Sequence, residues 1–167
     1  MRYVVKQKIV ALKPEYTIAD GTGKQIYKVN GSFLGRESFS ICNMEGQELA
    51  KCSTDVSPLN FLASILRYNL KKYHIRLNEE PVISMARSIN IFTYKLNVES
   101  KLGDLQLGYG VSGSYQMKLG GSIVCDIEKK NLVLGGDEYH VEVDDQQNQE
   151  AFLLTAIALD RIYFTRR

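Results

Sequence analysis

The chain has 167 residues, of which 44% are hydrophobic, and its 21 basic and 19 acidic residues give a formal net charge of +2. This length suits a single domain, and the hydrophobic content excludes a disordered chain because it allows a sizeable core. The balanced charge is unlike the strong basic excess of a dedicated nucleic-acid-binding protein. We therefore expect one domain over residues 1–167 and no nucleic acid among its partners.

The first element predicted is a strand over residues 2–12. After it, a pattern of an aromatic, a polar and an apolar residue recurs six times, at intervals of 21 to 34 residues. Such alternation is typical of strands with one buried and one solvated face, and its recurrence indicates a repeated unit. The aromatic residues, which we expect to point inward, are Tyr16, Phe39, Tyr73, Tyr94, Tyr115 and Tyr139.

Turn-forming residues follow most of these triplets and precede a second apolar stretch. Clear examples are D-G-T-G at 20–23 and G-G at 120–121, where glycine supplies the positive φ that tight hairpins need. The fourth turn, near residues 99–104, is longer. Five hairpins, the opening strand and a last strand over 139–143 predict about twelve antiparallel strands within residues 2–144.

Residues 147–163 break the strand pattern and predict a helix. Their centre, 151–159, is apolar at every position except Thr155, with acidic residues before it and Arg161 near its end, as the helix dipole favours. A helix that is apolar on all sides is buried or lies in a membrane. Since a span needs about 20 apolar residues, a buried central helix is favoured over a membrane tail.

The strands and the helix together predict a mainly β fold, an antiparallel closed barrel of about twelve strands around a buried C-terminal α-helix. A barrel of this size has an interior too wide for side chains alone. A helix of about 17 residues, roughly 25 Å long, would fill it. The polar central residues of the triplets then face outward, which is the reverse of an outer-membrane porin.

Three cysteines are too few and too irregularly spaced for a disulfide framework or a zinc site. We expect Cys42, Cys52 and Cys125 to be free thiols in a reducing cytoplasm. Residues 1–6 include the charged residues Arg2 and Lys6, and they do not contain the hydrophobic segment of a secretory signal. The sequence therefore predicts a cytoplasmic location.

The stretches Y-V-V-K-Q-K at 3–8, Y-T-I-A-D at 16–20, I-Y-K-V at 26–29 and A-I-A-L-D-R-I at 156–162, with the repeat, resemble the LURP-one-related family over nearly the whole chain. That family is similar in fold to the Tubby C-terminal domain and to phospholipid scramblases, so the resemblance implies a twelve-stranded barrel around a C-terminal helix. Its bacterial-type members have no established activity. Tubby domains bind phosphoinositide headgroups, but their basic positions and a scramblase-type calcium site have no residue-by-residue match here. The long stretch 53–70 departs from the hairpin pattern.

A basic segment over residues 67–76 is the candidate binding site. If Tyr73 and Ile75 point inward, the side chains on alternate positions share the outer face, whereas Lys71 alternates toward the barrel. An anionic headgroup or an acidic partner could bind this face; the alternative is a solvated strand face whose charges limit aggregation. The possible headgroup-binding residues are Arg67, Lys71, Lys72, His74 and Arg76.

Other candidates are weaker. Residues 59–70 form an amphipathic helical pattern that could cover a barrel end or contact a membrane or partner. The string G-Y-G-V-S-G at 108–113 fits G-x-G-x-x-G but precedes a strand-like segment, so we interpret it as a connection. The two histidines, His74 and His140, are too few for a metal site. No catalytic, cofactor or metal site is predicted.

We therefore expect a non-enzymatic binding module, cytoplasmic and peripheral to a membrane, that recognises anionic phospholipid headgroups or a protein partner. The alternative is a small-ligand carrier or an enzyme with a pocket at the end of the barrel, which would need a deep pocket with convergent polar groups.

Overall fold

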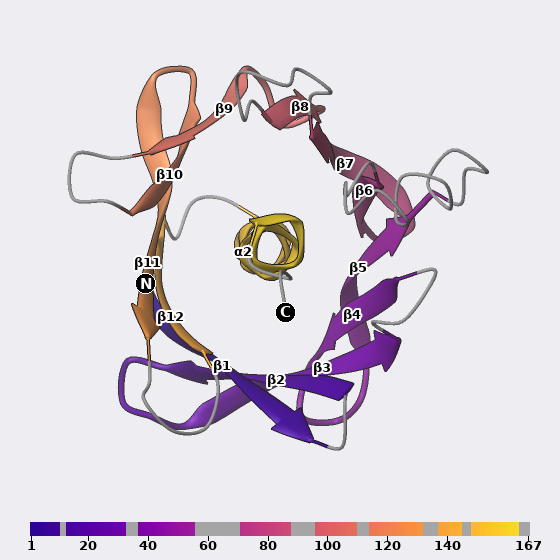
Figure 1. The fold of residues 1–167 in the computed structure, drawn as a ribbon, viewed down its shortest axis with the longest axis vertical. Coiled ribbons are helices and arrows are strands. Elements are labelled where there is room, and N and C mark those ends of the chain that lie inside the picture. Colours follow the sequence, from indigo (N-terminus) through magenta and orange to yellow (C-terminus); the bar gives the residue numbers. More distant parts are fainter. Residues whose placement is uncertain are drawn as a thin grey trace.

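The structure is a computed structural model that describes residues 1–10, 13–32, 37–55, 71–87, 96–109, 114–131, 137–144 and 148–163. The described residues form twelve strands that surround the helix α2 (Gln149–Tyr163), as Figure 1 shows. The strands are β1 (Arg2–Val10), β2 (Lys13–Asp20), β3 (Gln25–Ser32), β4 (Ser38–Cys42), β5 (Glu48–Thr54), β6 (Lys72–Leu77), β7 (Glu80–Arg87), β8 (Leu96–Ser100), β9 (Leu105–Tyr109), β10 (Tyr115–Leu119), β11 (Ser122–Asn131) and β12 (Asp137–Val143).

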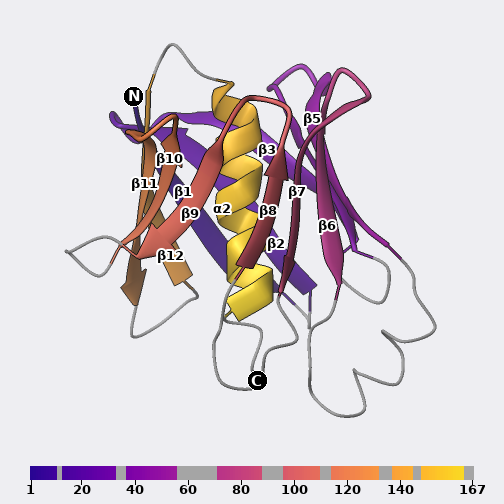
Figure 2. The ribbon, with the colours of Figure 1, turned by 90° about the horizontal axis from the view of Figure 1, so that it is seen from above.

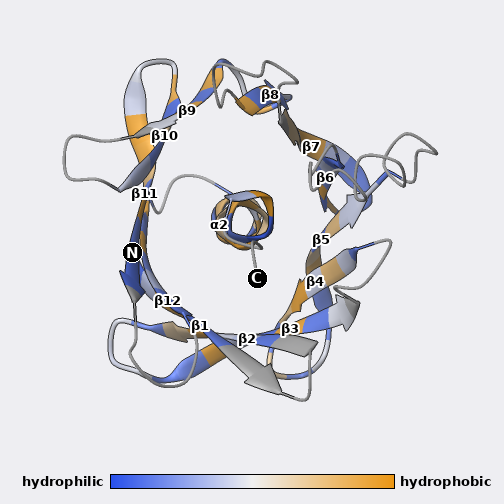
Figure 3. Ribbon diagram, viewed as in Figure 1, coloured by the Kyte–Doolittle hydropathy of each residue, from blue (hydrophilic) through white to orange (hydrophobic). Residues whose placement is uncertain are grey.

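All twelve strands belong to one antiparallel sheet in the order β8-β7-β6-β5-β4-β3-β2-β1-β12-β11-β10-β9. Pairing of β1 with β12 brings the two ends of the strand region together, with Tyr3 opposite Val141. Hydrophobic and hydrophilic residues alternate along many of these strands (Figure 3), as a sheet with one buried face requires. The predicted mainly β fold around a C-terminal helix is confirmed.

The predicted barrel was fully closed, whereas the hydrogen-bonded sheet is open between β8 and β9. These strands are the two ends of the sheet, although only residues 101–104 separate them in sequence. The amide of Lys101 donates to the carbonyl of Val82 over 2.9 Å, and the amide of Gly120 donates to the carbonyl of Asp104 over 3.1 Å. The start of the connection is thus bonded to β7, and its end is bonded to the turn that follows β10. The strands β8 and β9 diverge from this connection.

The barrel has two distinct ends because consecutive strands run in opposite directions. At the end that we call the upper end, β2 ends, β3 begins and α2 begins; at the lower end, β3 ends, β4 begins and α2 ends (Figure 2). Every later connection alternates between the two ends in the same way. The segments between β1 and β2, and between β5 and β6, therefore start and finish at the lower end.

The repeated aromatic residues form the wall of the core, as predicted. Tyr16, Phe39, Tyr73, Tyr115 and Tyr139 are all buried, and the residues two positions later, such as Ile18 and Ile41, are buried with them. Tyr94 and the amphipathic pattern over 59–70 lie outside the described residues.

Helix α2 fills the centre of the barrel, as predicted. Every residue from Ala151 to Asp160 is buried, and so is Ile162. Arg161 lies in the last turn, as predicted, and the acidic residue of the first turn is Glu150. The helix packs mainly against β4 to β7 and against β12.

One glycine is required by the packing of the sheet. Gly31 in β3 has a φ of 145°, and a Cβ built there would lie 2.2 Å from the carbonyl oxygen of Ser38 and 2.5 Å from the Cα of Phe39. Only glycine accepts both this backbone conformation and this approach of β4.

Candidate functional site

The predicted basic face on β6 is present, but its charges are bonded to neighbouring side chains. Lys72 donates to Glu99 on β8 over 2.9 Å. His74 lies between Ser84, 2.8 Å from Nδ1, and Asp55, 2.9 Å from Nε2. These contacts neutralise much of the charge of the face.

Of the remaining residues of the predicted site, Arg76 lies on the same outer face of β6, and Lys71 does not. Arg76 is exposed and lies opposite Lys51 across the β5–β6 pair, so it is nearer the upper end of the barrel. Lys71 turns toward the barrel, as its alternation predicts, and donates to Glu37 over 2.8 Å. Arg67 lies outside the described residues. The described candidates therefore do not form one site: three lie on the outer face of β6, whereas Lys71 contacts the buried carboxylate of Glu37.

Glu37 is the centre of a buried ionic cluster that the sequence did not reveal. Only 3% of Glu37 is exposed, and its carboxylate accepts hydrogen bonds from Lys71, from Tyr73 over 3.2 Å and from Arg161 Nε over 3.2 Å. Burial lowers the pKa of Arg161, but hydrogen bonding and attraction to Glu37 outweigh it, so the pKa is raised. The cluster joins the last turn of α2 to β6 and to the residue before β4.

A second buried cluster holds Asp160, whose side chain accepts hydrogen bonds from two tyrosines of the wall. Tyr16 donates over 2.7 Å and Tyr139 donates to the other carboxylate oxygen. Burial first, and then the charge of Asp160, raise the pKa of both phenols. The phenols therefore stay protonated and act as donors.

Two further hydrogen bonds hold the first turn of α2 at the upper end. Tyr3 donates to the side chain of Gln149, and Tyr27 donates to Glu150 over 2.9 Å. Among the described residues, every buried side-chain nitrogen or oxygen has a hydrogen-bond partner. The polar groups inside the barrel are thus used to position the helix, and their arrangement is structural in character.

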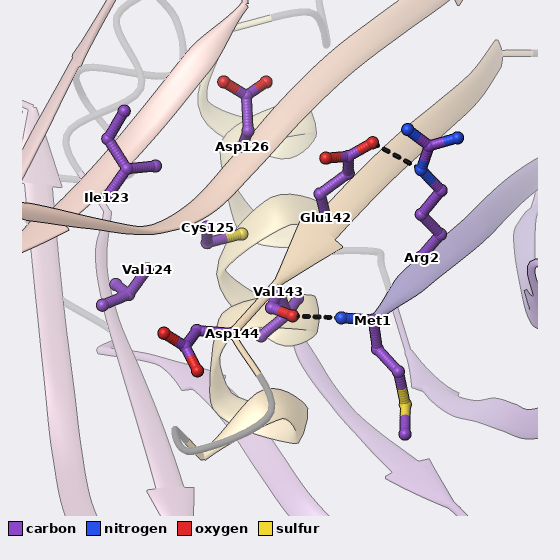
Figure 4. Close-up of a pocket in the computed structure, with 9 residues that line it drawn as sticks. All are labelled: Met1, Arg2, Ile123, Val124, Cys125, Asp126, Glu142, Val143 and Asp144. Carbon is purple, nitrogen blue, oxygen red and sulfur yellow. Dashed lines mark hydrogen bonds and ion pairs between the residues drawn. The ribbon is translucent and has the colours of Figure 1, made fainter.

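A surface pocket of about 410 Å³ lies at the upper end, where β12 stops between β11 and β1 (Figure 4). It exists because a bulge in the β10–β11 pairing and the early end of β12 leave the start of β11 uncovered. Its polar groups are bonded within the protein: Arg2 lies 2.6 Å from Glu142, and Asp126 accepts from Gln116 over 2.8 Å. Its polar groups therefore do not converge on a ligand position.

The pocket also contains a cysteine, Cys125, of which 1% is exposed. Burial, followed by the charge of Asp126, raises the pKa of its thiol. A thiolate is the nucleophilic form of cysteine, so this environment opposes covalent chemistry there. As predicted, Cys42, Cys52 and Cys125 are free thiols, and all are buried.

Other sequence signals for a site are resolved as follows. Gly108 and Tyr109 belong to β9, so the interpretation of G-Y-G-V-S-G as a connection was wrong for its first two residues; residues 110–113 lie outside the described part. His140 faces Glu138 at 2.7 Å. Within the described ranges, no three His, Cys, Asp or Glu side chains could hold a metal ion.

No described helix is long and apolar enough to cross a membrane.

The comparisons with known proteins agree with this architecture. The family model for LURP-one-related proteins matches residues 1–160, which is nearly the whole chain. This chain belongs to the LURP-one-related family. No curated protein sequence matches it. Among solved structures, this LURP-one-related chain is similar to the X-ray structure of a protein from Arabidopsis thaliana, AT5G01750, with a TM-score of 0.53 and 14% identity, covering 99% of this chain and 93% of that one. At this identity the likeness shows the fold alone.

Proposed function

We propose that this LURP-one-related protein is a non-enzymatic module, peripheral to a membrane in the cytoplasm, that binds anionic phospholipid surfaces with the lower end of its barrel. The observation that carries the proposal is the difference in charge between the connections at the two ends. Lower-end connections, with the residues after α2, contain six basic and two acidic residues, a net charge of +4. Those at the upper end contain two basic and five acidic residues, a net charge of −3.

The residues behind this difference come from many separate connections. The segments that join strands at the lower end or follow α2 contain Arg36, Arg67, Lys71, Lys95, Arg166 and Arg167, with Glu37 and Asp55, and of these the structure describes Glu37, Asp55 and Lys71. At the upper end they are Lys24 and Lys101, with Glu45, Glu79, Asp104, Asp144 and Asp145. Both lower-end acids are already bonded, Glu37 to Lys71 and Arg161, and Asp55 to His74.

The lower-end connections are also rich in large apolar residues. Sequence pairs and triplets of this kind are Phe33–Leu34, Phe61–Leu62, Ile91–Phe92 and Leu132–Val133–Leu134. Basic and apolar side chains together are the composition of interfacial membrane-binding segments, where apolar groups enter the headgroup region and cations meet anionic lipids. The upper-end connections are mainly polar turn residues such as G-T-G-K at 21–24, with two large apolar residues, Met44 and Leu102.

We propose a non-enzymatic role because the interior of the barrel is occupied by the helix and by the side chains that hold it. Helix α2 occupies the centre, and the buried carboxylates Glu37 and Asp160 are bonded to it or belong to it. Substrate binding inside the barrel would require displacement of the helix. In the described part of the chain, a carrier or enzyme could use the surface pocket, but its thiol is buried and its carboxylates Asp126 and Glu142 are bonded within the protein.

Flotation of the protein with vesicles of phosphatidylcholine, with and without phosphatidylserine, tests the proposal. The triple variant Arg36→Gln, Arg67→Gln, Arg166→Gln should weaken binding to anionic vesicles by about 3 kcal/mol, or about 150-fold, at about 1 kcal/mol for each basic residue. The matched control, Lys24→Gln with Lys101→Gln at the upper end, should bind as the unmodified protein does.

A third variant distinguishes the lower end from the outer face of β6. Lys72→Gln with Arg76→Gln removes two basic side chains of that face and leaves Lys71, the partner of the buried Glu37, in place. Binding that is lost in this variant and kept in the lower-end variant would assign the headgroup site to β6 instead. Equal binding of all variants to neutral and anionic vesicles, insensitive to salt, would refute the lipid proposal.

A further inference from the structure

The seam between β8 and β9 presents main-chain groups whose direction follows from the neighbouring ladders. Hydrogen-bonded and non-hydrogen-bonded pairs alternate along an antiparallel ladder. The bond from Lys101 to Val82 fixes the phase of the β7–β8 ladder, so Asn97 and Glu99 are bonded to β7. The amides and carbonyls of Leu96, Val98 and Ser100 consequently point to the seam.

The same reasoning applies to β9 on the other side. The bond from Gly120 to Asp104 fixes the phase of the β9–β10 ladder, so Gln106 and Gly108 are bonded to β10. The amides and carbonyls of Leu105 and Leu107 point to the seam. Within the described chain, no backbone hydrogen bond joins β8 to β9, and two strand edges therefore face each other unpaired.

The inner side of the seam is apolar. Leu96, Val98 and Leu107 pack against the core but remain only partly buried. Helix α2 packs against β4 to β7 and β12, and Figure 2 shows β8 and β9 diverging from their shared turn with α2 behind them. An additional strand at the seam would cover these three side chains.

Gly108, in β9, is a glycine that the fold does not require. Its φ lies outside the left-handed region, and a Cβ built on it would meet no atom within 4 Å. This contrasts with Gly31, where β4 lies against the backbone. A glycine inside a strand weakens the strand and often marks the close approach of another backbone, and no described atom occupies the space that a Cβ of Gly108 would face.

Charges around the seam are paired within the protein. Lys72 lies 2.9 Å from Glu99, and Lys101 lies 3.4 Å from Glu80. Asp104, the other charged residue of the two strands and their connection, accepts from Gln106 over 3.1 Å. The rim thus carries two ion pairs and one further carboxylate, and charge complementarity favours an uncharged occupant over a strongly charged one.

We propose that the β9 edge of the seam binds an extended, uncharged segment of a protein partner, which joins the sheet as a strand antiparallel to β9. Alternating amides and carbonyls are complementary to an extended chain, and this mode of recognition is β-strand addition. The segment would place apolar residues inward, over Leu107 and Val98, and polar residues outward. The five residues of β9 set its length at about 17 Å. This interaction is separate from the lipid surface and goes beyond it.

Amide hydrogen exchange of the free protein tests the premise. Amides of Val98, Ser100 and Leu107 should exchange about tenfold faster or more than those of Asn97, Glu99 and Gln106 in the same strands. Equal protection of both sets would mean that β8 and β9 pair with each other in solution, and would overturn the proposal.

Binding is tested with a ten-residue peptide of alternating threonine and valine with a lysine at each end. Saturating peptide should slow exchange of the Leu105 and Leu107 amides about tenfold or more and leave Gln106 unchanged. Absence of this protection would overturn the proposal.

Discussion

Removal of Glu37 is the perturbation whose effect follows most directly from the structure. Glu37 is 3% exposed and accepts from three donors, of which Arg161 is itself largely buried, with 11% of its side chain exposed. Glu37→Ala leaves this guanidinium and the Lys71 ammonium without their shared carboxylate. Breaking a buried ion pair by removing one partner costs about 3–5 kcal/mol.

For a domain of this size each kcal/mol shifts the melting temperature by about 2–4 °C, so Glu37→Ala should melt roughly 6–20 °C lower. The assay is urea and thermal unfolding followed by circular dichroism. Glu99→Ala is the matched control, because it removes a carboxylate that also pairs with a lysine but has 74% of its side chain exposed; it should cost about 0–1 kcal/mol. A loss below about 1 kcal/mol for Glu37→Ala would refute the role of this cluster in holding α2.

Further predictions concern the other buried groups. Tyr16→Phe and Tyr139→Phe should each cost about 1–3 kcal/mol in urea unfolding, because each removes a donor from buried Asp160; no loss in either would show that Asp160 is hydrated. Since burial and Asp160 raise the pKa of both phenols in the fold, the unfolded chain loses these protons first, and their contribution to stability is complete below pH about 10 and falls above it. Iodoacetamide should label Cys125 at pH 8 in the unfolded chain only, because burial raises the pKa of its thiol; rapid native labelling would contradict its burial. Gly31→Ala should cost about 1–3 kcal/mol through backbone strain and the clash with β4; stability equal to that of the unmodified protein would mean that β4 shifts freely.

The fold could be predicted because its pattern is local and repeated. Each triplet such as Tyr16–Ile18 indicates which face of its strand is buried. The run 151–159, apolar except for Thr155 and too short to span a membrane, favours a helix at the centre of the barrel. Up-and-down topology then follows from short turns between successive strands. The opening between β8 and β9 could not be predicted, because it depends on which neighbour the backbone of residues 101–104 bonds to.

The buried polar clusters could not be predicted from local sequence patterns, because they join residues that are far apart in the sequence. Glu37 lies 124 positions from Arg161, and nothing local distinguishes it from a surface glutamate. The available signal was Asp160–Arg161 itself, because both residues lie inside the predicted helix 147–163 and Asp160 is buried. Charged residues at the end of a fully buried helix imply buried partners, and the tyrosines of the triplets were the natural donors.

The orientation of the protein on a vesicle tests the central functional claim most directly. An environment-sensitive fluorophore would be attached to a single introduced cysteine, Asn60→Cys between lower-end strands or Glu45→Cys in an upper-end turn, since the natural cysteines are buried. On vesicles that contain phosphatidylserine, we predict a blue-shifted emission for the label at position 60 and unchanged emission at position 45, with both unchanged on neutral vesicles. A shift at position 45 alone, or at neither position, would contradict membrane binding by the lower end of the barrel.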